Sequence, residues 1–219
     1  MNVLILGATG MVGQGVLREC LLDDGVARVV TLGRTATGQA HPKLREIVHA
    51  DLLDLSPVQD RLGGLDACFY CLGASAAGLS EAEYTRINYA TTLSVAETLV
   101  RLDPDVVFVY VSGAGTDSTE RGRTMWARVK GRTENALLRM PFRSAYMLRP
   151  GLIVPMHGVK SKTRLYRAFY TVLAPVLPVL KALFPRSIIT TEQLGRAMLR
   201  LARSGYPKPV LEAADLAVL

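Results

Sequence analysis

The chain has 219 residues, of which 49% are hydrophobic and 21% charged, which suits one well-packed globular domain and excludes a disordered chain. Three cysteines exclude a disulfide-dense secreted scaffold, and no signal peptide precedes the first strand-like run, so we expect a cytoplasmic protein. The net charge is +7, and residues 135–191 hold nine Lys and Arg but no acidic residue, which predicts an anionic neighbour for that stretch.

The first third of the chain alternates short apolar runs with one amphipathic segment. The run Asn2–Leu6 ends at a glycine, as a buried parallel strand does, and Met11–Leu22 carries apolar residues at helical spacing. Three further strands are expected at Arg28–Leu32, Arg45–His49 and Asp66–Cys71.

The same alternation continues to Pro150. A long helix is predicted over Ser80–Leu102, because Glu83 follows Ser80 at the spacing of a capping box. A strand, a helix and a strand are then expected at Asp105–Val111, Arg123–Arg139 and Ser144–Arg149. Strands that alternate with helices predict an α/β fold, a Rossmann-like doubly wound parallel sheet.

The pattern changes from Gly151 onward. Residues Gly158–Phe184 are basic at first and then nearly all apolar, while Thr191–Arg203 is predicted to be a helix and Pro209–Glu212 a short strand. We expect a single domain over residues 1–219, in which residues 151–219 form a smaller helical lobe packed on the rest.

A glycine-rich turn joins the first strand to the first helix, with the sequence Gly7-Ala8-Thr9-Gly10-Met11-Val12-Gly13. The three glycines suit a tight turn, close approach of the backbone to a pyrophosphate, and close packing of helix on strand. The free N–H groups at the helix N-terminus would hold the anion. We expect Gly7 and Thr9 to Gly13 to bind a dinucleotide, with a purely structural turn as the alternative.

The type of dinucleotide depends on the end of the second strand, which has the sequence Thr31-Leu32-Gly33-Arg34. An acidic residue there would hold the ribose 2′-OH of NAD, whereas an arginine can pair bidentately with a 2′-phosphate. Arg34 therefore predicts NADP(H) as the cofactor, with a solvated surface arginine as the alternative.

Further motifs follow the later predicted strands: Asp51-Leu52, Cys71-Leu72-Gly73, Ser112 and Arg149-Pro150-Gly151. With the glycine turn, their order resembles the short-chain dehydrogenase/reductase superfamily, and the glycine spacing is similar to its atypical branch of NmrA-like and epimerase-like proteins. The resemblance covers residues 1–155 or so. It implies that Asp51 and Leu52 border the adenine, that Leu72 and Gly73 pass beneath the adenosine ribose, and that Lys130 holds the nicotinamide ribose.

The catalytic position departs from this resemblance. Active members of the superfamily combine a serine with Tyr-x-x-x-Lys, in which the tyrosine transfers a proton. Here the segment is Trp126-Ala127-Arg128-Val129-Lys130, so the resemblance assigns Ser112 and Lys130 as catalytic residues while a tryptophan replaces the acid. Because an indole N–H does not titrate near neutral pH, ketone or alcohol chemistry by that mechanism is not expected.

Other side chains are alternatives for the missing proton donor. Ser118 and Thr124 are too weakly acidic without activation, whereas Tyr166 and Tyr170 could reach over the nicotinamide. His157 has a suitable ordinary pKa of about 6.5, and a surface loop histidine is the competing interpretation.

No metal site is expected. Cys68 and Cys71 form C-x-x-C, but residues three apart on a strand point to opposite faces, so they share neither a metal ion nor a disulfide. The three histidines also lack metal-ligand spacing.

The basic stretch suggests several partners. Ala168–Leu180 is uncharged but shorter than the roughly 20 residues of a membrane span. Its basic flanks would suit peripheral contact with an acidic membrane surface, while a pocket wall or a homodimer contact are the alternatives. No nucleic-acid-binding signature accompanies the charge, so no nucleic acid is expected.

The sequence as a whole predicts an NADP(H)-binding oxidoreductase-like protein that acts on a small hydrophobic or anionic substrate, with residues 151–219 as the substrate or lid lobe. Ser112 would hold the substrate oxygen and Lys130 the ribose. The alternative is a non-catalytic NADP(H)-binding redox sensor or regulatory protein, which Trp126 favours.

Overall fold

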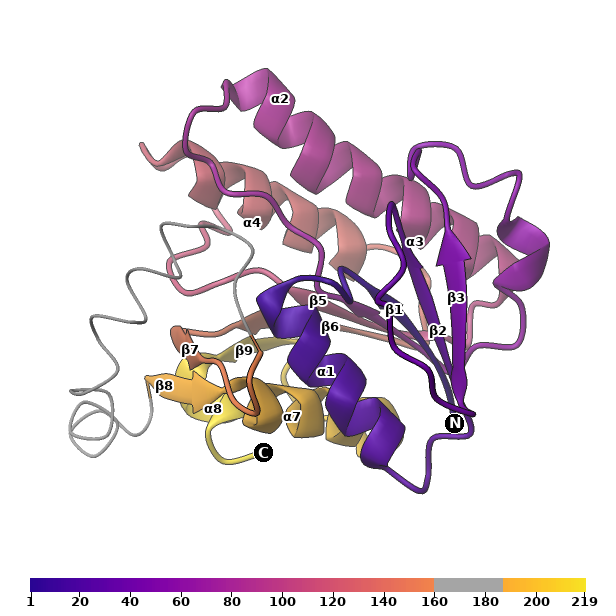
Figure 1. The fold of residues 1–219 in the computed structure, drawn as a ribbon. Helices are drawn as coiled ribbons and strands as arrows, with labels where there is room; N and C mark the ends of the chain where they lie inside the picture. Colours follow the sequence, from indigo (N-terminus) through magenta and orange to yellow (C-terminus); the bar gives the residue numbers. More distant parts are fainter. Residues whose placement is uncertain (160–186) are drawn as a thin grey trace.

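The computed structural model of the chain describes residues 1–159 and 187–219 (Figure 1). Its main sheet has seven strands in the order β3-β2-β1-β4-β5-β6-β9, and every neighbouring pair is parallel. The strands are β1 (Asn2–Leu6), β2 (Arg28–Gly33), β3 (Leu44–Val48), β4 (Ala67–Tyr70), β5 (Val107–Val111), β6 (Ser144–Arg149) and β9 (Val210–Glu212). The predicted α/β, Rossmann-like doubly wound sheet is confirmed.

Helices cover both faces of this sheet (Figure 1). One face carries α2 (Glu81–Thr85), α3 (Thr91–Leu102) and α4 (Met125–Leu138), and the other carries α1 (Met11–Leu22) and α7 (Thr191–Ser204). The short helix α8 (Ala213–Leu216) follows β9 and also packs on α7. Within the described ranges, no helix combines the length and the apolar character that a bilayer crossing needs.

The core is divided by the sheet into two apolar clusters. Along β1, Val3 and Ile5 join the cluster under α1 and α7, while Leu4 and Leu6 join the cluster under α3. This alternation is what a strand buried on both faces requires. Cys68 belongs to the second cluster and Cys71 packs against the first, and all three cysteines of the chain are free thiols.

The strand order fixes where a ligand is expected. From β1 the chain proceeds outward to β2 and β3, then returns to place β4, β5 and β6 on the other side of β1. The crevice outside the carboxyl ends of β1 and β4 is therefore the switch point of the sheet, the usual ligand position in such folds. The glycine turn, the Leu72-Gly73 loop and Ser112 all follow strands that end at this edge.

The long helix predicted over Ser80–Leu102 differs from the observed one in its middle. Its start is confirmed, since Ser80 is the N-cap of α2 and forms a capping box with Glu83. Between α2 and α3, however, residues Arg86–Ala90 form a π-helical turn. The wider turn directs the side chain of Asn88 toward the loop after β4.

Two short strands were not expected from the sequence. β7 (Leu152–Val154) pairs in parallel with β8 (Ile188–Thr190), and this ribbon places the start of α7 beside the loop after β7. The predicted division into a domain with a smaller lobe at 151–219 stays a prediction, because residues 160–186 lie outside the described ones. In the described part, β9 extends the main sheet and α7 packs along α1.

Candidate functional site

The glycine turn is held by close backbone contacts. Gly7 has a left-handed φ of +79°, and a Cβ on it would lie 2.7 Å from the backbone of Cys71 and Leu72. A Cβ on Gly13 would lie 2.1 Å from the carbonyl oxygen of Gly7. Both positions therefore require glycine, and the contacts bring α1 and the loop after β4 against the end of β1.

The N-terminus of α1 is open toward the same crevice. Gly10 is the N-cap, no side chain caps it, and the first turn holds no acidic residue. Among the residues that the structure describes, the N–H groups of Met11, Val12 and Gly13 have no acceptor. Free donors at the positive end of a twelve-residue helix fit an anionic pyrophosphate. Thr9 supports the turn, because its carbonyl accepts a hydrogen bond of 3.0 Å from Gln14 Nε2.

Arg34 lies directly after β2, at the position where a ribose is expected. Its side chain is exposed, and it has no ion pair or hydrogen bond with any residue of the described ranges. An exposed guanidinium without a partner fits a 2′-phosphate, since a carboxylate at this position would repel one.

The residues predicted around the adenosine have different surroundings. Asp51 is exposed and accepts a hydrogen bond of 2.9 Å from the N–H of Leu53, whereas the Leu52 side chain is buried in the core. Leu72 is half-buried and Gly73 is exposed, in the loop that touches Gly7. Leu72 and Gly73 are thus brought to the glycine turn, and the roles of all four residues stay predictions.

Asn88 is a site residue that the sequence analysis missed. It is 2% exposed, its Oδ1 accepts a hydrogen bond of 3.2 Å from the N–H of Ala74, and its Nδ2 donates to the Tyr84 carbonyl. A Cβ on Gly73 would lie 3.5 Å from Asn88 Oδ1 and 3.9 Å from Lys130 Nζ. Asn88 therefore fixes the loop after β4 beside Lys130. The available signal was a polar residue at helical spacing from the apolar residues Tyr84 and Val95.

Lys130 is a largely buried cation at this crevice. Its Nζ donates a hydrogen bond of 2.6 Å to the carbonyl of Ser112 and lies 5.7 Å from the ring centroid of Tyr110. Burial lowers the pKa of Lys130 to about 8, while the negative charge of Glu134 acts in the opposite direction. An ammonium carries three protons, and the Ser112 carbonyl takes one of them.

Trp126 occupies the helical turn before Lys130 on α4. It is half-buried, and its ring approaches Gly115, where a Cβ would lie 3.5 Å from Trp126 Cη2. Since residues four apart share one face of a helix, Trp126 and Lys130 face the same side. The side chain beside Lys130 thus supplies an apolar surface and one N–H donor, and no titratable proton.

Ser112 is 8% exposed and its hydroxyl faces the protein interior. Its Oγ lies 2.5 Å from Glu134 Oε1 and 2.9 Å from the Leu148 carbonyl. Glu134 is 1% exposed, and Arg149 donates to both of its oxygens through Nε and Nη2. Arg149 belongs to a motif recognised in the sequence, whereas Glu134 was assigned no role there. The available signal for Glu134 was its spacing of four from Lys130 on the same helix.

The alternative proton donors lie elsewhere. His157 has a left-handed φ of 55°, and its Nε2 lies 2.8 Å from Glu192 Oε2. The Ser118 hydroxyl accepts from Arg149, and Thr124 is an exposed N-cap without a side-chain cap bond. Tyr166 and Tyr170 lie outside the described residues. None of the described donors is brought to Lys130.

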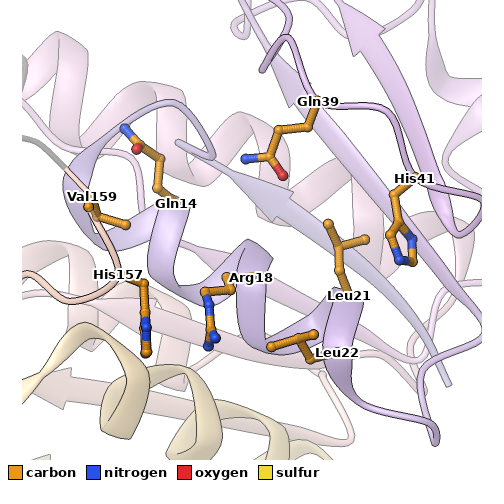
Figure 2. A pocket seen from close by; sticks show the side chains of 9 residues that line it. Gln14, Arg18, Leu21, Leu22, Gln39, His41, His157 and Val159 are labelled. Atoms are coloured by element: carbon orange, nitrogen blue, oxygen red, sulfur yellow. The ribbon is translucent and has the colours of Figure 1, made fainter.

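A cavity of about 390 Å³ lies along α1, between the loop after β2 and the loop after β7 (Figure 2). It contains none of the residues predicted to bind the cofactor. Two of its basic side chains already have carboxylate partners, Arg18 at 2.6 Å from Glu19 and His157 beside Glu192. Its lining residues are Gln14, Arg18, Leu21, Leu22, Gln39, His41, His157, Gly158 and Val159.

The fold and the site together define a dinucleotide-binding protein of the Rossmann type. A strand, a glycine turn and an uncapped helix meet at the switch point of a parallel sheet. The chain belongs to the NAD-dependent epimerase/dehydratase family, which it matches over residues 3–125. The family and the site together indicate a nicotinamide-cofactor-binding protein.

The chain is similar to fungal proteins whose names describe them as mitochondrial. The protein fmp52 of Emericella nidulans is 30% identical over 159 residues, covering 69% of this chain and 66% of that protein. The protein fmp52-1 of Aspergillus terreus is 31% identical over 170 residues, covering 74% of this chain and 70% of that protein. The match thus spans just under two thirds of the Emericella relative.

Solved structures share the fold. The Bordetella bronchiseptica enzyme WbmF, in complex with NAD+, has a TM-score of 0.68 at 19% identity, covering 99% of this chain and 76% of that one. The UDP-glucose 4-epimerase of Thermotoga maritima has a TM-score of 0.69 at 14% identity, covering 97% and 76%. At these identities the likeness concerns the fold alone.

The predicted localisation and the predicted partners of the protein have different outcomes. The expectation of a cytoplasmic protein is contradicted by the relatives, which are named mitochondrial. Its physical basis was weak, because three free thiols exclude a disulfide framework without specifying a compartment. The contact with an acidic membrane and the homodimer both depended on residues 160–186, which lie outside the described residues, and they stay predictions.

Proposed function

We propose that the chain binds NADP(H), with Arg34 paired to the 2′-phosphate and the glycine turn holding the pyrophosphate. The observation that carries this proposal is the exposed, unpartnered Arg34 guanidinium at the carboxyl end of β2, in the part of the chain that the structure describes. The free N–H groups of Met11, Val12 and Gly13 support it. Asp51, Leu52, Leu72 and Gly73 would surround the adenosine.

Calorimetric titration with NADPH and with NADH tests the cofactor. We expect NADH to bind at least about tenfold more weakly, a difference of about 1.4 kcal/mol. Arg34→Gln should remove this preference by weakening NADPH alone, while Arg139→Gln, at an exposed C-cap of α4, serves as the matched control. Equal affinity of the wild type for both nucleotides would contradict the assignment of Arg34.

At the other end of the cofactor, we propose that Lys130 donates to the nicotinamide ribose. Only one of its protons is taken by the Ser112 carbonyl, and Nζ lies beside Gly73 at the crevice. When bound, the cofactor supplies hydride transfer at its nicotinamide ring. The protein would contribute the orientation of the ribose through Lys130 and an apolar wall through Trp126.

The leading activity is an NADP(H)-dependent oxidoreductase-like reaction on a small hydrophobic or anionic molecule. Nine basic residues and no acidic one between positions 135 and 191 favour an anionic substrate. Ser112 is the candidate for holding the substrate oxygen, which requires its hydroxyl to leave Glu134. The proton would come from a residue other than Trp126.

A second candidate function is NADP(H) binding without turnover, as a redox sensor or regulatory protein. Two observations favour it: Trp126 beside Lys130 has no titratable proton, and the Ser112 hydroxyl is engaged by Glu134. Regulatory proteins of the NmrA-like kind are the proposed analogue.

A comparison of Trp126→Tyr with Trp126→Phe separates the two candidates. Both variants remove the indole, but only tyrosine supplies a titratable hydroxyl one turn before Lys130. NADPH oxidation is followed with small carbonyl compounds, some of them anionic. Activity in the wild type supports the oxidoreductase. Activity in the tyrosine variant alone supports binding without turnover, because it shows that the missing acid is limiting.

A further inference from the structure

We propose that Glu134 is a positioning residue of this site, which holds the Ser112 hydroxyl in the interior and keeps Lys130 directed at the ribose. The inference rests on the proposed role of Lys130 in cofactor binding. It starts from one juxtaposition. Two residues of α4, one helical turn apart, form hydrogen bonds with Ser112 at two different atoms. Lys130 Nζ binds the Ser112 carbonyl at 2.6 Å, and Glu134 Oε1 lies 2.5 Å from its hydroxyl oxygen.

Arg149 compensates the negative charge of the buried Glu134 carboxylate. Glu134 is 1% exposed, and an isolated charge at such a place would be strongly unfavourable. Arg149, at the end of β6, donates from Nε to both carboxylate oxygens and from Nη2 to Oε2, a forked arrangement. Its remaining Nη1 lies 3.1 Å from Glu212 at the end of β9. The pair therefore ties α4 to the ends of β6 and β9.

The first consequence concerns the proton of Ser112. A hydroxyl has one proton, and a carboxylate 2.5 Å away is a stronger acceptor than the Leu148 carbonyl at 2.9 Å. While Ser112 donates to Glu134, it has no proton to donate to a substrate oxygen. Glu134 thus withdraws this hydroxyl from the crevice.

The second consequence concerns the charge of Lys130. Two titratable groups act directly on Lys130: Glu134 on the same helix and Tyr110 from β5. A third charged group, Arg149 from β6, lies behind Glu134 and is paired with it. Burial raises the pKa of Tyr110 well above its ordinary value, so this ring stays neutral. Glu134 therefore supplies the negative charge that keeps Lys130 protonated against its burial.

The test compares Glu134→Gln with Glu81→Gln. Glu81 also pairs with a cation of α4, since its Oε2 lies 2.7 Å from Arg128 Nη2, but its side chain is 54% exposed. Two quantities are measured between about pH 6 and pH 9, a range that spans the Lys130 pKa. The first is the dissociation constant of NADPH. The second is the rate of reductive methylation of Lys130 in the nucleotide-free protein, located by peptide mass spectrometry.

In Glu134→Gln we expect Lys130 to lose its proton at a pH lower by about one unit, which makes its methylation about fivefold faster at pH 7 and about tenfold faster at pH 6. NADPH binding should begin to weaken at a correspondingly lower pH. Glu81→Gln should match the wild type in both measurements. If Lys130 in Glu134→Gln reacts as in the wild type and NADPH binding keeps its pH dependence, the positioning role is refuted.

Two further outcomes are separable. If Glu134→Gln does not fold, the double variant Glu134→Gln with Arg149→Met removes both buried charges and carries the same measurements. If the wild type does not bind NADPH, the proposed function fails. The methylation rate in the free protein then still tests whether Glu134 keeps Lys130 protonated. An unchanged rate in Glu134→Gln refutes this role, and a faster rate supports it.

Discussion

Replacing Gly13 with alanine should loosen the packing of α1 against the turn that begins at Gly7. The new Cβ would lie 2.1 Å from the Gly7 carbonyl oxygen and 2.6 Å from its carbonyl carbon. Carbon and oxygen atoms in favourable contact are about 3.3 Å apart, so the backbones must separate by roughly 1 Å. The obstructing atoms belong to the backbone, so no change of side-chain rotamer can relieve the contact.

The helix has little freedom to move away, because its other side is equally close to α7. A Cβ on Gly15 would lie 2.4 Å from Thr191 Cβ, and a Cβ on Gly195 would lie 2.8 Å from Glu19 Cγ. Overpacking at such a place costs up to about 3 kcal/mol, whereas alanine gains about 1 kcal/mol over glycine in a helix. We therefore expect Gly13→Ala to lower the free energy of unfolding by about 2 kcal/mol.

Gly10→Ala is the matched control from the same turn. Its Cβ would meet a single nearby atom, the Gly7 carbonyl oxygen at 3.3 Å, and its φ of −83° suits any residue. We expect a loss of no more than about 1 kcal/mol from this N-cap substitution. Both variants should bind NADPH more weakly, since the methyl group of Gly10→Ala stands where the pyrophosphate approaches.

The assay is urea unfolding followed by far-ultraviolet circular dichroism, with the midpoint and the slope fitted for each variant. The expected result is a lower midpoint for Gly13→Ala at an unchanged slope. A Gly13→Ala protein within about 0.5 kcal/mol of the wild type would refute the close approach of α1 to Gly7. Loss of NADPH binding in that variant at full stability would instead give Gly13 a direct role in binding.

Three further substitutions test the charges and caps. Burial lowers the pKa of Lys130 from 10.5 to about 8, so the unfolded chain holds this proton more firmly, and protein stability should rise as the pH increases between these values. In urea unfolding, Lys130→Met should be more stable than the wild type at pH 7 and should lack this part of the pH dependence. An equal gain in the free energy of unfolding at pH 7 and near pH 10 would contradict the lowered pKa of Lys130. Arg149→Met should lower the free energy of unfolding by about 3 kcal/mol because it leaves Glu134 buried and unpaired, and adding Glu134→Gln should restore most of that loss. Ser80→Ala removes the capping box with Glu83 and should cost about 1 kcal/mol in the same assay, with no effect on NADPH affinity.

The elements set by local patterning were predictable from the sequence. The bounds of β1, α1 and β6 coincide with those predicted from apolar runs and helical spacing, and the capping box placed the start of α2 correctly. The glycine turn could also be placed, because strand, turn and helix are contiguous in the chain. The parallel, doubly wound character of the sheet followed from the same alternation of strand and helix, whereas the order of its strands was not predicted.

Contacts between distant segments were not predictable in the same way. The pairing of β7 with β8 joins residues on both sides of positions 160–186, and two three-residue strands carry little local signal. Glu134, viewed along α4, is one polar residue in a mixed helix. Its burial depends on β6 lying next to β5, which brings Arg149 at the end of β6 and Ser112 directly after β5 to the same carboxylate.

The face of α4 that meets the crevice therefore combines three residues at a spacing of four: Trp126, Lys130 and Glu134. The first replaces a titratable hydroxyl by an indole, and the third draws the Ser112 hydroxyl into the interior. Between them, Lys130 keeps the protons that a ribose can accept from it. Such a face is better suited to holding a nicotinamide ribose than to protonating a substrate. A redox reaction at this site consequently requires a proton donor from outside α4 and β5, whereas a hydrogen bond to a ribose requires nothing beyond Lys130.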